Sequence, residues 1–132
     1  MSDVKARVLV ADPDPDVSRT LTIYFNDHGY QVETVELAAL VFNRARQWQP
    51  DAILVSTEFV DVSPYQVCQH ILEDPRTAHI PTIMLLHLND RKSRLAALEV
   101  GVDDVVAKPI DLEELRLRME AAIRLAALRV QP

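Results

Sequence analysis

Short apolar runs alternate with longer segments of helical period along the chain. In several of these runs the apolar residues are consecutive, as in Val8–Val10 and Ile53–Val55. Consecutive apolar residues are typical of parallel strands that helices cover on both faces. The predicted strands are Arg7–Ala11, Tyr30–Thr34, Ala52–Val55, Thr82–Leu86 and Val102–Ala107.

The segments between the strands carry helix start and stop signals. Asp14 before Pro15 and Ser63 before Pro64 each combine an N-cap residue with proline at the first helical position. In the second helical segment, Leu37, Val41, Ala45 and Trp48 are expected to face inward, with Trp48 serving for packing. The predicted helices begin after Asp14 and end before Gly29, run from about Glu36 to Trp48, begin after Ser63 and end at Asp74, run from about Asn89 to Val100, and run from Asp111 to about Leu128.

Five strand–helix units in succession predict a single α/β domain. The expected architecture is a doubly wound, five-stranded parallel sheet with five helices, of the flavodoxin-like (βα)5 type, formed by residues 1–132 with a core from about 5 to 128. In such folds ligands bind at the carboxyl ends of the strands. Function is therefore expected near residues 12–14, 56–61, 86–89 and 108–109.

Charge and composition exclude several classes of function. The net charge of −6 and the pI near 5.1 argue against a nucleic-acid binder. No run reaches the roughly 18 to 20 apolar residues that span a bilayer, and the first ten residues lack the pattern of a signal peptide. The single cysteine, Cys68, lies on an apolar helix stripe and is expected to be a buried small hydrophobe. We expect a cytoplasmic protein without membrane contact.

The first predicted loop, from Asp12 to Asp16, decides whether a cofactor is expected. It has three aspartates and no glycine, so it would repel the phosphates of a nucleotide or flavin. Mg²⁺ remains an alternative, with Asp12 as a weak candidate ligand. We favour the simpler interpretation, in which the acidic residues stabilise a helix N-terminus and no metal or cofactor is bound.

A first strand with its acidic loop and helix, followed by four segments in this order, carries a resemblance that covers about residues 5–128. The chain resembles the receiver domain of bacterial response regulators, and the Gly-x-Asp-Asp…Lys-Pro segment is its most specific part. The segments are Pro50–Val55, Ile80–Leu85, Gly101–Pro109 and Asp111–Leu115.

The resemblance implies a phosphorylation site, and several of its positions are altered here. Receiver domains accept a phosphoryl group on their own aspartate at the end of the third strand. Two acidic residues hold Mg²⁺, and a hydroxyl and a lysine hold the phosphoryl oxygens. The resemblance also implies a cis peptide bond between that lysine and the proline. Two of the family's positions are kept, Asp12 as the first acidic residue and Lys108, with Pro109, as the lysine. Ser56 stands at the position of the phosphorylated aspartate, and Pro13, beside Asp14, at that of the second acidic residue. Leu86, followed by His87, replaces the hydroxyl residue, and Val105 replaces the switch aromatic.

These departures have one chemical consequence. A serine without a base is weakly nucleophilic, Mg²⁺ loses the carboxylates replaced by Pro13 and Ser56, and Leu86 cannot donate a hydrogen bond. The sequence therefore predicts a pseudo-receiver that acts as a phosphorylation-independent interaction module and not as an enzyme. Lys108 is expected to pair with Asp12 and His87 to fill the pocket. Glu58 and Asp61 could replace the lost carboxylates, but we favour the interpretation in which they are solvated loop residues.

The last predicted helix has apolar residues on two sides. One stripe, from Leu112 through Met119 to Ala126, fits the core. The other side is expected to form an interface, on the face that receiver domains build from helix four, strand five and helix five. Its partner would be a histidine kinase, a downstream effector or a second copy related by a two-fold axis. The expected interface residues are Val105, Leu117, Arg118, Ala121, Arg124, Leu125 and Leu128.

Two alternatives stay open at this point. The chain could be phosphorylated, with Mg²⁺, at a non-standard carboxylate such as Asp14 or Glu58. It could also be a hydrolase-like enzyme in which Ser56 is the nucleophile, and His87 is then the one candidate base.

Overall fold

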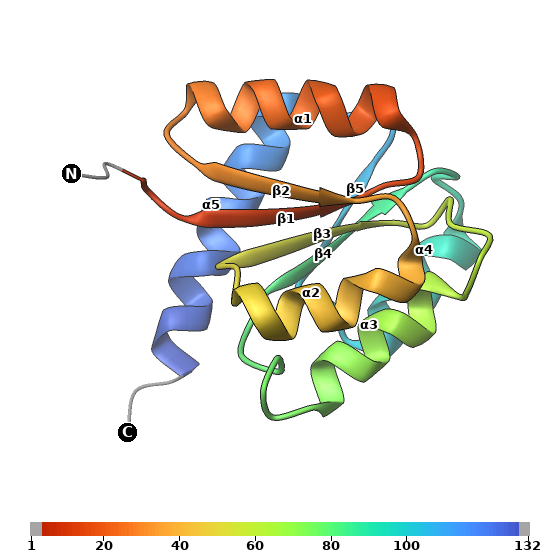
Figure 1. Ribbon diagram of the computed structural model, residues 1–132. Helices are drawn as coiled ribbons and strands as arrows, with labels where there is room; N and C mark the ends of the chain where they lie inside the picture. Colours follow the sequence, from red (N-terminus) through yellow and green to blue (C-terminus); the bar gives the residue numbers. More distant parts are fainter. Residues whose placement is uncertain (1–3, 130–132) are drawn as a thin grey trace.

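The computed structural model describes residues 4–129 of the chain. Five parallel strands form one sheet in the order β2-β1-β3-β4-β5, with helices on both faces (Figure 1). The predicted fold class is confirmed. In chain order the elements are β1 Arg7–Ala11, α1 Pro15–Asp27, β2 Gln31–Val35, the 3-10 turn η1 Ala38–Leu40, α2 Val41–Trp48, β3 Ala52–Ser56, α3 Pro64–Glu73, β4 Thr82–Leu86, α4 Arg91–Val100, β5 Asp104–Ala107 and α5 Leu112–Arg129.

The strand order places β1 at the point where the winding of the sheet reverses. The chain passes from β1 to β2 on one side and then crosses back to β3 on the other side of β1. The carboxyl ends of β1 and β3 are therefore neighbours, and Asp12 and Ser56 meet there. This is the position at which open α/β sheets place their functional sites.

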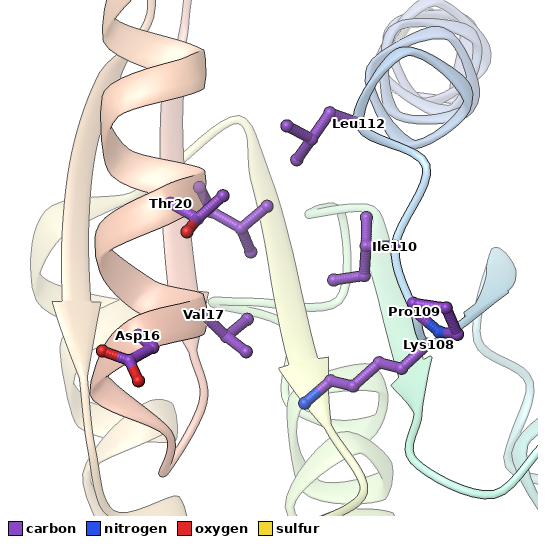
Figure 2. A pocket seen from close by; sticks show the side chains of 8 residues that line it. Asp16, Val17, Thr20, Lys108, Pro109, Ile110 and Leu112 are labelled. Carbon is purple, nitrogen blue, oxygen red and sulfur yellow. The ribbon is translucent and has the colours of Figure 1, made fainter.

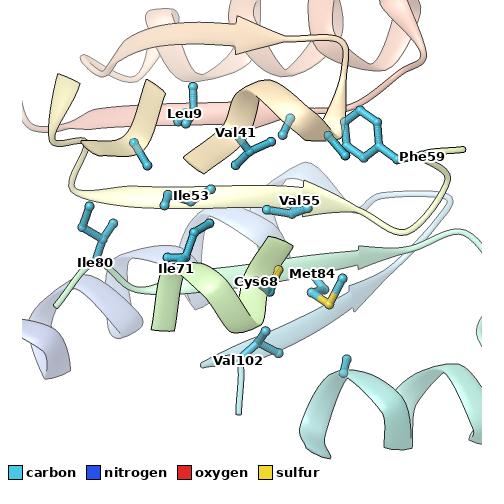
Figure 3. Close-up of a cluster of buried hydrophobic side chains, with 14 of the residues drawn as sticks. Leu9, Val41, Ile53, Val55, Phe59, Cys68, Ile71, Ile80, Met84 and Val102 are labelled. Carbon is cyan, nitrogen blue, oxygen red and sulfur yellow. The ribbon is translucent and has the colours of Figure 1, made fainter. Parts of the chain in front are cut away.

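The sheet separates two apolar clusters. Leu21 and Phe25 of α1 pack with Leu115 and Met119 of α5 on one face of the sheet. The other face packs against α2, α3 and α4, with Cys68 and Met84 near the middle of that cluster (Figure 3). The expectation that Cys68 is buried is confirmed, and its burial raises the pKa of the thiol to about 12.

Side-chain caps mark the starts of α1, α3 and α5. The Asp14 carboxylate accepts a hydrogen bond from the backbone N–H of Asp16 at 2.9 Å, and the Ser63 hydroxyl accepts one from Gln66 at 3.3 Å. Asp111 accepts one from the N–H of Glu114 at 3.1 Å, at the predicted capping position of α5. Each cap satisfies an amide that the first turn of a helix leaves without an internal partner.

Several predicted boundaries were wrong by one or two residues. β2 lies one residue later than predicted, β3 extends to Ser56, and α4 begins after an N-cap at Asp90. β5 begins at Asp104 and not at Val102, because Asp103 is bound to the start of β4. Its N–H donates to the Thr82 carbonyl and its carboxylate accepts from the Thr82 N–H, both at 2.8 Å.

The second helical segment differs most from the prediction. A 3-10 turn at 38–40 precedes α2, which begins at Val41 and not at Glu36. Leu37 was predicted to face inward and is instead exposed, since it lies in extended backbone before the turn. The other three predicted inward residues are buried or packed against the core.

Among residues 4–129, no helix combines the length and the apolar character that crossing a bilayer requires.

Candidate functional site

Asp12 and Ser56 form the floor of the site. Both are fully buried, Ser56 at the last position of β3 and Asp12 directly after β1. A carboxylate without contact to water needs hydrogen-bond donors or a cation close by. The Asp12 carboxylate has both, because Oδ1 accepts from the N–H of Asp14 at 2.9 Å and Oδ2 lies 2.7 Å from the Lys108 ammonium.

Lys108 reaches this floor from β5, at the edge of the sheet. It follows β5, its peptide bond to Pro109 is cis, and its side chain extends across the strand ends (Figure 2). The ammonium nitrogen contacts three oxygens, which are Asp12 Oδ2 at 2.7 Å, Glu58 Oε1 at 3.1 Å and Ser56 Oγ at 3.3 Å. The predicted Lys108–Asp12 pair and the cis peptide are confirmed.

Glu58 belongs to the site, contrary to the favoured interpretation of it as a solvated loop residue. Its carboxylate binds Lys108 and also lies 2.6 Å from Nδ1 of His87. The turn after β3 places it there, because the Glu58 N–H donates to the Ser56 hydroxyl at 3.0 Å and bends the loop over the strand end. The sequence did contain a signal for this role, because Glu58 follows Ser56 by two residues, next to a strand end that a lysine must reach.

His87 does not fill the pocket as predicted. Its side chain is 57% exposed and contacts Glu58 from the rim. Its backbone N–H donates to the Thr57 hydroxyl at 2.9 Å, so the β4–α4 loop is tied to the β3–α3 loop. The space at the end of β4 is instead occupied by Leu86, which is buried and offers no polar group.

The remaining acidic residues serve local structure. The Asp14 carboxylate caps α1, so it does not join the site. Asp61 is an exposed loop residue, as expected, and its two oxygens also accept hydrogen bonds from the N–H groups of Ala38 and Ala39 at 3.1 and 3.0 Å. These bonds lower the pKa of Asp61.

The geometry does not assemble a nucleophilic serine. The Ser56 hydroxyl contacts the Glu58 N–H and the Lys108 ammonium, both of which are donors, and the His87 ring binds Glu58 instead. Within residues 4–129, no base therefore takes the proton of the Ser56 hydroxyl, as nucleophilic activation requires.

A groove runs beside Lys108, between α1 and the β5–α5 loop. It encloses about 300 Å³ and is mainly apolar, with Asp16 and Thr20 at its α1 side (Figure 2). Val17, Ile110 and Leu112 point into it from the two sides, and the stem of Lys108 closes one end.

The predicted interface lies away from this groove. Leu117, Leu125 and Leu128 on α5 are exposed, as expected, whereas Val105 on β5 is half-buried against the core. Arg118 pairs with Asp104 of β5 at 3.1 Å and lies 3.9 Å from Glu114. Hydrogen bonding to Asp104 and the charge of that carboxylate raise the pKa of Arg118.

The sequence is similar to those of response regulators. The family model of the response regulator receiver domain matches residues 8–120, and the chain belongs to this family. It is 34% identical over 118 residues to the DNA-binding dual master transcriptional regulator RpaA of Synechocystis, covering 89% of this chain and 49% of RpaA. It is also 34% identical over 117 residues to the transcriptional regulatory protein KdpE of Mycobacterium tuberculosis, covering 89% and 50%. The chain thus spans about half the length of these curated relatives.

Solved structures agree on the fold. The receiver domain of a signal transduction histidine kinase from Syntrophus aciditrophicus superposes with a TM-score of 0.83 at 24% identity, covering 90% of each chain. A CheY-like receiver domain protein from Methanospirillum hungatei gives 0.85 at 15% identity, covering 93% of this chain and 97% of the other. Both structures share the fold of this chain.

Proposed function

We propose that this receiver domain works as an interaction module whose state is not set by phosphorylation. The observation that carries the proposal is the contact set of Lys108, whose ammonium is held by the carboxylates of Asp12 and Glu58. To hold the oxygens of an incoming phosphoryl group, this ammonium would have to leave its contacts with the two carboxylates. Here two anions of the protein itself already neutralise it.

The acceptor and the metal ligands support the same proposal. Ser56 stands where the family has aspartate, so transfer would yield a phosphate ester and not an acyl phosphate. Mg²⁺ needs about six oxygen ligands, but both carboxylates in this pocket are bound to an ammonium. No group of three or more His, Cys, Asp or Glu side chains within 4–129 is arranged to hold a metal ion. The residues present therefore fit Mg²⁺ poorly.

The proposed partner surface is the face of α4, β5 and α5. The exposed Leu117, Leu125 and Leu128 follow one side of α5, and α4 adds the exposed Leu95 and Leu98. A surface with this many apolar side chains is typical of protein contacts. We propose a cytoplasmic partner that is a histidine kinase, a downstream effector or a second copy of the chain.

Incubation with acetyl phosphate and Mg²⁺, followed by intact-mass measurement, tests the proposal. We expect no phosphoryl adduct on the native chain. The matched control is the variant Pro13→Asp, Ser56→Asp and Leu86→Thr, which restores the acceptor, the second acidic residue and the hydroxyl. An adduct on the control alone supports the proposal and shows that the assay works.

An adduct on the native chain would overturn it. Loss of that adduct in Glu58→Gln, or in Asp14→Asn, would identify which of the two non-standard carboxylates accepts the phosphoryl group. An adduct that survives both changes and resists mild base, which hydrolyses acyl phosphates but not serine esters, would point to Ser56.

A further inference from the structure

Four large apolar side chains are exposed on two loops at the carboxyl edge of the sheet. Val60 is 96% exposed, Leu37 50%, Leu40 49% and Val62 42%. They belong to the β2–α2 and β3–α3 connections, which lie at the same end of the molecule (Figure 1). We call these four residues the loop patch. It lies apart from the face of α4, β5 and α5.

Hydrogen bonds join the two loops into one surface. The carboxylate of Asp61, which lies between Val60 and Val62, accepts from the N–H groups of Ala38 and Ala39, which lie between Leu37 and Leu40. The bonds are 3.1 and 3.0 Å long, so the apolar side chains of both loops lie around a single fixed junction. A prearranged patch loses little conformational entropy on binding.

A groove continues from the patch between α2 and α3. It encloses about 220 Å³, and Val62, Phe42 and His70 contribute to its wall. The rings of Phe42 and His70 are stacked with their centroids 3.7 Å apart, which gives the groove a flat aromatic side. A groove of this size beside exposed aliphatic side chains fits one large apolar anchor of a partner.

The charges on the two loops are acidic. The segments 36–43 and 57–67 contain three acidic residues and no lysine or arginine. Glu58 is paired with Lys108, whereas Glu36 and Asp61 make no salt bridge within residues 4–129. The nearest cations along the chain are already paired, Arg44 with Glu33 and Arg76 with Asp74. Arg76 also lies over the Phe42 ring, 5.8 Å from its centroid, with its charge shared with Asp74. Complementary charge steers a partner to such a surface and excludes partners of like charge.

We infer that the loop patch is a second docking surface, for a partner segment that combines apolar anchors with Lys or Arg. An amphipathic helix or turn of this kind places an aliphatic or aromatic residue in the α2–α3 groove and its basic residues beside Glu36 and Asp61. This goes beyond the proposed function, because it holds whether or not the domain accepts a phosphoryl group.

A synthetic amphipathic helix of leucine and lysine is the probe, titrated against the full chain by fluorescence anisotropy and NMR shifts. We expect binding that shifts the signals of Leu40 and Val60 and weakens at least about tenfold in Leu40→Ser with Val60→Ser. The matched control is Ile23→Ser on α1, which is 56% exposed and should bind the peptide unchanged. Val60→Ser alone, at an exposed loop position, covers the case in which the double variant does not fold.

Three outcomes would overturn the inference. A scrambled peptide of equal charge that binds as tightly would show attraction to the net charge of −6 alone. A peptide with glutamate in place of lysine that binds equally would remove the role of Glu36 and Asp61. Self-association of the native chain that Val60→Ser abolishes would assign the patch to a second copy.

Discussion

Replacing Lys108 with methionine tests the central contact of the site. Methionine keeps much of the volume of the side chain and removes the ammonium. The Asp12 carboxylate, which is fully buried, would keep its bond from the N–H of Asp14 and lose its one cation. Glu58, which is partly exposed, would lose the same cation but could be solvated.

The expected cost follows from the burial of the two groups. Removing one partner of a buried ion pair typically costs 3–5 kcal/mol, because the other charge is left uncompensated. Lys108 lies at the edge of the sheet with 12% of its side chain exposed, so some water can reach the vacated space. We therefore expect a loss at the lower end, about 3 kcal/mol, and a fall in Tm of about 10 °C for a domain of this size.

A double-mutant cycle separates the pair from the loss of packing. Asp12→Asn leaves Lys108 in contact with Glu58, so it should cost only about 1 to 2 kcal/mol. The double variant, Asp12→Asn with Lys108→Met, has no buried charge at this point and should be more stable than Lys108→Met alone. Urea unfolding followed by circular dichroism measures all three free energies of unfolding.

Lys92→Met is the matched control. Lys92 is exposed on α4 and makes no salt bridge within residues 4–129, so its replacement should change stability by less than about 0.5 kcal/mol. If Lys108→Met cost no more than this control, or if the double variant lost the sum of the two single losses, Lys108 would not neutralise Asp12 in solution.

Three further results are expected. Leu117→Glu with Leu125→Glu should leave the fold intact and weaken association measured by ultracentrifugation, because both side chains are exposed; unfolding of this variant would mean that α5 is rotated relative to the core. Cys68 should resist a thiol reagent at pH 8 in the native chain and react on unfolding, because burial raises its pKa to about 12; rapid native labelling would contradict this. Tyr30→Phe, which removes a 2.5 Å hydrogen bond to Glu120, should cost about 1 to 2 kcal/mol at neutral pH. That bond lowers the pKa of Glu120 below its unfolded value, so the stability it contributes is present above the unfolded pKa and falls as the pH is lowered; a variant equally less stable at pH 7 and in acid would contradict it.

The positions of most helices and strands could be predicted from the sequence, because the capping signals and the apolar periodicity agree. Consecutive apolar residues at Ile53–Val55 fit a strand buried on both faces. Asp14-Pro15 and Ser63-Pro64 mark helix starts, because their cap side chains accept hydrogen bonds from N–H groups of the first helical turn. The pair of Lys108 with Asp12 was predictable for a similar reason. Both residues follow strands of one parallel sheet, and a charge buried at that edge needs a partner.

The details that failed depend on contacts between segments distant in the chain. The spacing of Leu37 fits a helical stripe. The Asp61 carboxylate of another loop, however, binds the 3-10 turn that follows Leu37, and the Leu37 side chain remains exposed to solvent. Val102 and Asp103 read as strand, but Asp103 binds the start of β4 and delays β5. Spacing along one segment contains no information about either partner.

The chemistry of the pocket shows the same division. The sequence by itself determined which groups are missing, because Ser56, Pro13 and Leu86 lack the functional groups that phosphoryl transfer uses. Only the tertiary structure decided which contacts the pocket contains instead. The turn after β3 brings Glu58 to Lys108, and His87 contacts Glu58 from the rim of the pocket. Residue types fix which bonds a side chain can make, whereas the direction of a loop and the distance between two strand ends fix which of them it does make.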